Sequence, residues 1–223
     1  MPWCLVPELS GAASVLKEFQ PPIDGRLQAR IDLADALTPE EIAAIPPAMI
    51  ISRPNAKTLP DVIGWNTGPF LLSPRLKALI EALDPGVHTF KPVAIRTDGV
   101  FYGRREHGDY HILITAPRID ALVIEQTDFA FGFGERERGR AGYDTSLARS
   151  AAGRGVARAR FCEREDSQRT LSARAIGDRH LWRLPEVYWS RLMCSDHLRD
   201  EMKREKMRGW DFQSYFRLQA AGV

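Results

Sequence analysis

The sequence predicts an α+β fold, in which a mixed or mainly antiparallel sheet is flanked by helices. Three observations support this class: short apolar strands alternate with amphipathic helices, Gly, Pro and Asp mark the turns between them, and a strand-helix-strand pattern occurs twice. The chain has 223 residues, 44% of them hydrophobic, which suits a globular protein with a sizeable core.

Residues 1–60 are predicted to form an irregular segment with short helices that packs on the core. Residues 14–19 and 26–37 have apolar side chains at helical spacing. The stretch TPEEIAAI begins with a capping box, in which Thr38 is the N-cap and Glu41 follows three residues later. We therefore expect helices over these stretches, the last of them ended by two prolines.

Residues 61–223 are predicted to form the main α+β domain. Its first part, residues 68–95, has the pattern of strand, helix, turn and strand. Ser73 is a natural N-cap and is followed by Pro74, a favoured first helical residue. The predicted helix has one apolar face, made of Leu76, Leu79, Ile80 and Leu83. The TDG stretch at residues 97–99 offers a turn, and residues 100–116 are predicted to form another hairpin.

The end of the chain repeats the strand-helix-strand pattern. Ser73 and Ser195 occupy equivalent positions, as do Gly86 and Gly209 with one residue of slippage. The repeat suggests two similar units packed on a common sheet. Because the second helix is more polar, we expect it at the surface with a narrow buried edge of Leu198 and Met202.

An Arg- and Gly-rich excursion at about residues 130–172 interrupts the main domain. We expect a long loop with one short strand. Residues 135–174 contain ten arginines and six acidic residues, a net charge of +4. This leaves open, as an alternative function, binding of nucleic acid or another polyanion. The near balance of 31 basic and 29 acidic residues in the whole chain does not favour that alternative.

Three groups of residues resemble reactive or ligand-binding sites. His107 and His111 lie four residues apart, but in a strand they stand ~13 Å apart, too far to share one metal ion. Cys194, His180 and Asp178 have the chemistry of a nucleophile, a base and an orienting group, which leaves an unrecognised hydrolase as a second alternative. A buried structural cysteine is the favoured interpretation. The glycine-rich stretch FGFGERERG lacks the third glycine of a dinucleotide site, so no cofactor is expected.

Residues 171–184 alternate in polarity and predict a strand. On such a strand His180 and Trp182 share one face, while Arg179 and Arg183 share the other. We expect His180 to be a core or boundary histidine with one hydrogen-bonding partner rather than a catalytic base.

The sequence predicts a cytoplasmic protein. Its three cysteines show no CxxC spacing, which argues against a disulfide framework. The first residues lack the basic and apolar regions of a signal peptide, and no stretch approaches 18 apolar residues.

The order of these segments resembles an immunity protein family of bacterial polymorphic toxin systems, the myxobacterial-type group first catalogued as a domain of unknown function. The most telling segment is RIDALVIEQTDF, and the closing strand-helix-strand unit is the second marker. The resemblance covers roughly residues 65–217. It implies a non-enzymatic protein that neutralises a cognate toxin by direct binding, and it carries no catalytic residues over to this chain.

If the protein binds a toxin, its hot spots should favour Trp, Tyr and Arg. We expect them at four residues that are predicted to be exposed, Arg179, Arg183, Trp189 and Trp210, although each tryptophan can equally be a core residue. Immunity proteins directed against basic nucleases tend to be strongly acidic. Because this chain has a pI of about 8.5, we expect a toxin that is not a strongly basic nuclease.

Overall fold

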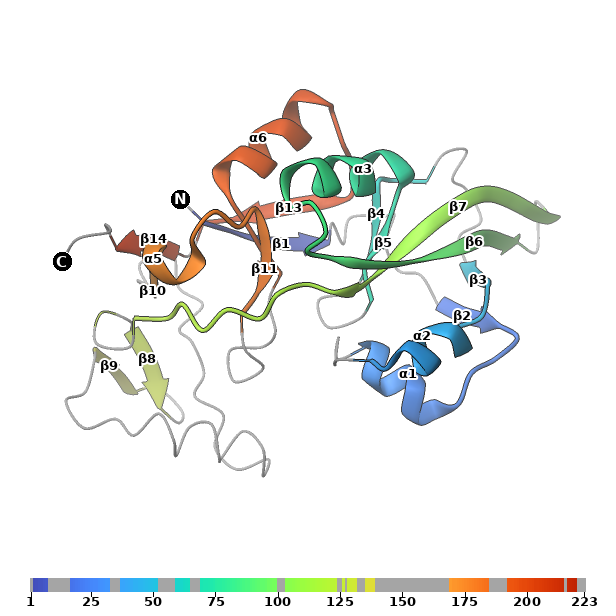
Figure 1. Cartoon of the computed structure of the whole chain (residues 1–223), viewed down its shortest axis with the longest axis horizontal. Helices are drawn as coiled ribbons and strands as arrows, with labels where there is room; N and C mark the ends of the chain where they lie inside the picture. The colour runs from blue at the N-terminus through green and yellow to red at the C-terminus, as the bar shows by residue number, and fades with distance from the viewer. Residues whose placement is uncertain are drawn as a thin grey trace. The chain divides into compact units, whose positions relative to one another are not determined.

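The computed structural model describes residues 2–7, 17–32, 37–51, 59–64, 69–99, 103–123, 126, 128–131, 135–138, 169–184, 192–214 and 216–219. The predicted fold class is confirmed, since the chain has an α+β fold with sheets flanked by helices (Figure 1). The helices are α1 (Gly25–Asp32), α2 (Pro39–Ala44), α3 (Pro74–Leu83), α5 (Ala173–Ile176) and α6 (Asp196–Arg204). The strands are β1 (Trp3–Pro7), β2 (Lys17–Gln20), β3 (Ala48–Ile51), β4 (Val62–Ile63), β5 (Leu71–Leu72), β6 (Thr89–Gly99), β7 (Gly103–Thr115), β8 (Asp128–Phe131), β9 (Glu135–Arg138), β10 (Arg169–Ser172), β11 (Leu181–Arg183), β12 (Leu192–Cys194), β13 (Trp210–Gln213) and β14 (Phe216–Gln219).

The chain divides into two compact units. The first unit comprises Met1–Leu5, Arg118–Arg199 and Phe212–Val223, and the second comprises Val6–Pro117 and Asp200–Asp211. The division between residues 1–60 and 61–223 that the sequence suggests stays a prediction.

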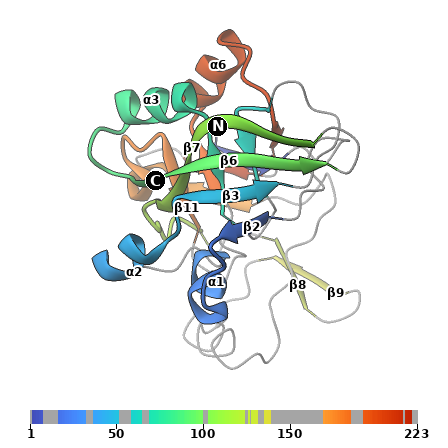
Figure 2. The ribbon, with the colours of Figure 1, turned by 90° about the vertical axis from the view of Figure 1, so that its right-hand side faces the viewer.

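The second unit contains a six-stranded mixed sheet with the order β2-β3-β6-β7-β5-β4. Strands β6 and β7 form a long antiparallel hairpin, with Val93 opposite Tyr110. The separate hairpin predicted over residues 100–116 is wrong, because Gly103–Thr115 form one continuous strand that pairs with β6. Figure 2 shows β2, β3, β6 and β7 side by side. Strand β3 joins β6 in parallel, and the other pairs are antiparallel, so the mixed sheet agrees with the expected class.

Apolar side chains of this sheet and its helices form one core. Helix α1 contributes Ile31 to the core, and Leu27 packs against it. The predicted capping box of α2 is confirmed, because the Thr38 hydroxyl accepts from the Glu41 amide and the Glu41 carboxylate accepts from the Thr38 amide. The core residues are Phe19, Ile31, Ile45, Met49, Ile51, Ile63, Leu71, Val93, Ile95, Tyr110, Ile112 and Ile114.

The helix predicted at residues 14–19 is wrong where the structure describes the chain, because Lys17–Gln20 form strand β2. Phe19 lies opposite Met49 in the antiparallel pairing of β2 with β3, and its side chain is buried in the core. A short helical pattern is a weak signal, and pairing with a buried strand outweighs it.

The first unit has smaller sheets. Strand β10 pairs in parallel with β14, and β11 pairs antiparallel with β12, so that Trp182 lies opposite Met193. Strands β11, β12, β1 and β13 follow one another in a four-stranded sheet. The buried apolar residues of this unit include Cys4, Leu5, Ala121, Leu171, Ile176, Leu181, Trp182, Leu184, Leu192, Met193, Cys194 and Leu198.

The single strand predicted over residues 171–184 is wrong in part. Helix α5 interrupts it, because the Ser172 hydroxyl accepts from the Ala175 amide and caps a single helical turn. Gly177, with a φ of 60°, ends this turn, and the chain resumes as β11.

The predicted repeat of strand, capped helix and strand is confirmed as β5-α3-β6 and β12-α6-β13. The Ser73 hydroxyl accepts from the Leu76 amide, and the Ser195 hydroxyl accepts from the Leu198 amide in the same way. The expected common sheet is wrong: the first pair of strands belongs to the six-stranded sheet and the second pair to the four-stranded sheet. Local capping repeats in sequence, whereas strand pairing depends on distant partners.

Candidate functional site

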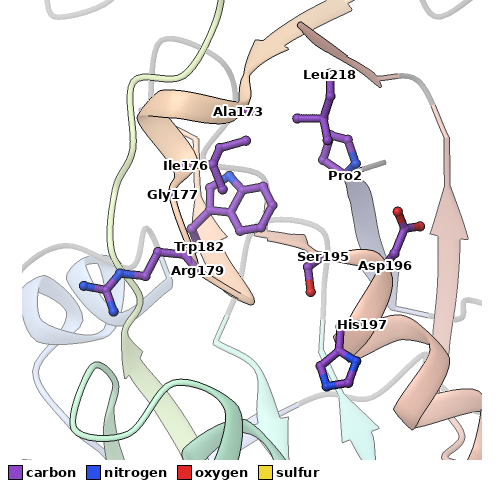
Figure 3. A pocket seen from close by; sticks show the side chains of 10 residues that line it. All are labelled: Pro2, Ala173, Ile176, Gly177, Arg179, Trp182, Ser195, Asp196, His197 and Leu218. Carbon is purple, nitrogen blue, oxygen red and sulfur yellow. The ribbon is translucent and has the colours of Figure 1, made fainter. Parts of the chain in front are cut away.

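A cavity of about 240 Å³ lies within the first unit. The segments around it come from near both ends of the chain, from α5, from β11 and from the start of α6 (Figure 3). Its lining residues are Pro2, Ala173, Ile176, Gly177, Arg179, Trp182, Ser195, Asp196, His197 and Leu218. This pocket combines apolar walls with a polar edge.

Trp182 forms part of the apolar wall, as Figure 3 shows, with Ile176 beside it. Pairing of β11 with β12 fixes the indole, which is only 1% exposed. Pro2 and Leu218 line the pocket opposite these two side chains. Leu218 on β14 is 42% exposed.

The polar edge is the beginning of helix α6. The Ser195 hydroxyl accepts from the Leu198 amide at 3.2 Å and also hydrogen-bonds Nδ1 of His180 at 2.8 Å. The rings of His180 and His197 lie 5.3 Å apart. The hydroxyl therefore serves the helix cap and fixes the neighbouring imidazole, as expected for a boundary histidine with a hydrogen-bonding partner.

Asp196 places a carboxylate at this edge. Its Oδ1 accepts from the indole Nε1 of Trp3 at 2.7 Å and lies 3.4 Å from Nη1 of Arg199. The Arg199 guanidinium also stacks over the Trp3 ring at 4.1 Å from the ring centre. Burial alone would raise the pKa of Asp196, but hydrogen bonds from the N-terminus of the chain and from Trp3, together with the charges of the N-terminus and of Arg199, lower it. Because its pKa is lowered, the carboxylate is charged at neutral pH. It borders the pocket, and its side chain is 47% exposed.

The sequence-predicted binding residues have different environments. Arg179 is exposed and lines the pocket, with its guanidinium directed away from the other labelled side chains in Figure 3. Trp210 is half-buried and stacks on Phe70 with ring centres 5.6 Å apart. Trp189 lies outside the described residues. A binding role for these three residues stays a prediction.

The expected exposure of Arg183 is wrong, because this side chain is only 4% exposed. Both faces of β11 are covered, so strand alternation does not separate an inner face from an outer one. Burial, with a contribution from the charge of Arg118, lowers the pKa of Arg183 to about 10. The Arg183 carbonyl accepts from the Ile119 amide at 2.9 Å, which ties β11 to the neighbouring segment.

The three residues of the hydrolase alternative have separate roles in the structure. Cys194 is fully buried in β12, between β1 and β11. Asp178 is exposed in the turn after α5, while His180 hydrogen-bonds Ser195. A buried thiol at the centre of a sheet has the environment of a packing residue.

The histidine pair at residues 107 and 111 lies in strand β7, as expected from the β-rich sequence around it. Burial, together with the charge of Lys77, lowers the pKa of His111. Within the described parts of the chain, no three His, Cys, Asp or Glu side chains gather as a metal site requires. In the Arg- and Gly-rich excursion, residues 139–168 lie outside the described residues, and so does the short strand expected there.

Sequence reasoning missed Pro2, Asp196 and Leu218 as residues around one pocket. Their separation along the chain gives no sequence signal. One local signal was present, since the Ser-Asp-His run at a helix start places polar groups together at its first turn.

The helices in the described parts of the chain are all too short or too polar to cross a membrane. A family model described as Immunity protein family (Imm11) matches residues 21–215, which is most of the chain. No curated protein matches the sequence. The match includes the segments that carry the resemblance and extends it toward the N-terminus. This chain therefore belongs to the Imm11 family of immunity proteins.

Proposed function

We propose that this protein neutralises a cognate bacterial toxin by binding it directly, without catalysing a reaction. The observation that carries this proposal is the family match over residues 21–215. The toxin belongs, in this proposal, to a polymorphic toxin system, and binding takes place in the cytoplasm of the producing cell. The bound protein would occlude or distort the active site of the toxin.

The arrangement of the reactive side chains supports a non-catalytic role. The candidate nucleophile Cys194 is buried, and the candidate base His180 is hydrogen-bonded to a helix cap. The amphipathic pocket has the size and chemistry of a binding feature. Arg179, at its edge, is an exposed arginine of the kind that is enriched in interface hot spots.

Co-expression with the toxin encoded beside this chain tests the proposal. We expect rescue of growth and co-purification of the two proteins at a constant ratio. Titrating the two expression levels separates binding from catalysis: a binder protects only while it matches the toxin in amount, whereas an enzyme protects at a small fraction of it. A catalytically inactive toxin is the growth control. Failure to rescue growth and to form a complex contradicts the proposal.

A further inference from the structure

The six-stranded sheet of the second unit has two faces, because successive side chains of a strand point to opposite sides. One face carries the core, to which Met49, Ile95 and Tyr110 belong and to which α1 and α2 contribute apolar side chains. The residues that alternate with these core positions lie on the other face, which we call the outer face. Figure 1 shows α3 above the β6-β7 hairpin and α1 and α2 below it. The core face is thus covered by α1 and α2, and the outer face is bordered by α3.

Strand pairing places four residues in one row across the outer face. Glu18 lies opposite Ile50, and Ile50 lies beside Arg96. Arg96 in turn lies opposite Glu106, with its Nε 3.3 Å from a carboxylate oxygen of that residue. Glu18 is exposed, Ile50 is half-buried, and the Glu106 side chain is 73% exposed. The row therefore begins and ends with a carboxylate and has an apolar residue between them.

The next row on the outer face has smaller side chains. Ala48 lies beside Ala94, and Ala94 lies opposite Asp109. Ala94 is half-buried, while Asp109 and the nearby Pro92 of β6 are exposed. The short side chains leave the middle of the outer face low between its carboxylates. A partner surface can therefore reach Ile50 and Ala94 and remove their apolar surface from water, which favours association.

The described side chains of the outer face carry a negative charge. Glu18, Glu106 and Asp109 supply three carboxylates against the one guanidinium of Arg96, a formal charge of −2. Arg96 lies beside Glu106. Within the described part of the chain, the side chains of Glu18 and Asp109 form no hydrogen bond or ion pair. The whole chain carries a charge of +2. The outer face is thus an acidic surface on a slightly basic protein, and a positively charged surface is its complement.

Helix α3 shows which chemistry already packs at the border of the outer face. The helix buries Leu76 and Ile80, and Nζ of its Lys77 lies 5.4 Å from the centre of the Phe90 ring. Phe90 lies two residues before Pro92 in β6 and therefore on the same face. An element of this chain with an apolar stripe and a lysine beside it thus packs at one end of the outer face.

We propose that the outer face binds a positively charged surface of the toxin, with apolar side chains of the toxin on Ile50 and Ala94 and basic side chains at Glu18 and Asp109. This inference rests on the toxin-binding function proposed above and adds the surface and its chemistry. A formal charge of −2 calls for a few basic side chains on the toxin surface and not for a strongly basic toxin. Complementary charge of this kind also speeds the association of two proteins.

Two variants and one matched control test the outer face. The double variant Glu18→Lys/Asp109→Lys reverses two of its carboxylates, and Ala94→Gln raises a neutral side chain from its middle. The control Asp178→Lys/Asp211→Lys makes the same change of charge at two exposed positions outside the strands of the outer face. Thermal unfolding of each variant confirms that it is folded before its Kd for the toxin is measured.

We expect the double variant to raise the Kd by at least about tenfold, because like charges then face each other across the interface. Ala94→Gln should raise the Kd by about tenfold, since the longer side chain keeps the two surfaces apart. The control should stay within about twofold, as exposed charges outside an interface do. Salt should raise the Kd of wild type more steeply than that of the double variant.

A charge swap identifies the basic side chains of the toxin. Each lysine and arginine of the toxin is replaced in turn by glutamate. At a position that meets the outer face, the replacement should weaken binding to wild type and strengthen binding to the double variant, because it restores an attractive pair.

Four results would overturn the inference in distinguishable ways. If wild type and the double variant bind the toxin equally well, the interface lies elsewhere and the proposed function stands. If, in addition, light scattering shows that wild type is a dimer and the double variant a monomer, the outer face joins two copies of this chain. If the double variant binds more tightly than wild type, the toxin surface is acidic and the charge assignment is wrong. If wild type neither binds nor protects, the proposed function fails, and the inference fails with it.

Discussion

Asp61 and Arg75 form a two-pronged ion pair in the second unit: Nε of Arg75 lies 2.5 Å from Oδ1 of Asp61, and Nη2 lies 2.6 Å from Oδ2. The same carboxylate accepts from the Ser73 hydroxyl at 2.8 Å and from the Arg208 amide at 2.9 Å. Asp61 is buried, so four hydrogen bonds converge on one desolvated charge. This carboxylate joins the start of α3 to the turn after α6.

Asp61→Asn should lower the free energy of unfolding by about 2 kcal/mol, because charge-assisted hydrogen bonds are lost inside the protein. Urea unfolding measures the change. The matched control is Glu81→Gln, which breaks the exposed ion pair with Lys77 and should cost about 0.3–0.5 kcal/mol. Equal losses in the two variants would show that burial of Asp61 does not strengthen its contacts.

Acid should destabilise the protein through the same carboxylate. Burial alone would raise the pKa of Asp61, but hydrogen bonds from Arg75, Arg208 and Ser73 outweigh it, and the pKa lies below its ordinary value of 3.8. A carboxyl group whose pKa is lowered on folding stabilises the protein above its unfolded pKa. This stabilisation is lost as the pH falls through the lower, folded pKa. Unfolding measured between pH 7 and pH 2 should show a steeper loss for wild type than for Asp61→Asn, and parallel curves would contradict the prediction.

Gly209→Ala should be more damaging than Gly86→Ala, although the two glycines end equivalent helices. Both have positive φ values, of 100° and 70°. A Cβ at Gly209 would overlap the Val62 carbonyl oxygen and lie 3.0 Å from Cβ of Pro60, whereas a Cβ at Gly86 meets nothing within 4 Å. We expect a loss of about 1 kcal/mol for Gly86→Ala from backbone strain alone. Gly209→Ala should lose at least about 3 kcal/mol in thermal or urea unfolding, and equal losses would show that the chain relaxes around the new methyl group.

The Tyr110 hydroxyl should ionise at a higher pH than that of an ordinary tyrosine. Burial, with a contribution from the charge of Asp61, raises the pKa of Tyr110 to about 12, and its hydroxyl donates to the Pro60 carbonyl at 2.9 Å. A raised folded pKa means that this contribution to stability is complete below pH 10 and is lost as the pH rises toward 12. The difference in ultraviolet absorbance between wild type and Tyr110→Phe during alkaline titration isolates this residue. A midpoint near pH 10 in the folded protein would contradict the prediction.

Local chemistry made several elements predictable from the sequence. The caps at Thr38 and Ser73 bind amides three residues further along, so their signals lie within a single turn. The extended segment predicted at the end of residues 68–95 is found as the first part of strand β6. The family resemblance rested likewise on the order of such segments.

Other predictions were wrong because the residues that pair with or cover these segments lie far away in the sequence. Residues 14–19 have a helical pattern, but pairing with β3 makes Lys17–Gln20 a strand. Arg183 is predicted as an exposed binding residue, but its side chain is buried. In each case, contacts from elsewhere in the chain outweigh the local preference.

The sequence by itself determined the fold class, the capped helices and the family of this protein, because each depends on residue types at short and regular spacing. Only the tertiary structure decided that Pro2, Trp182, Asp196 and Leu218 surround one pocket. The physical reason is that a pocket is a property of side chains brought together by sheet pairing and packing. No spacing along the chain records which distant residues will meet.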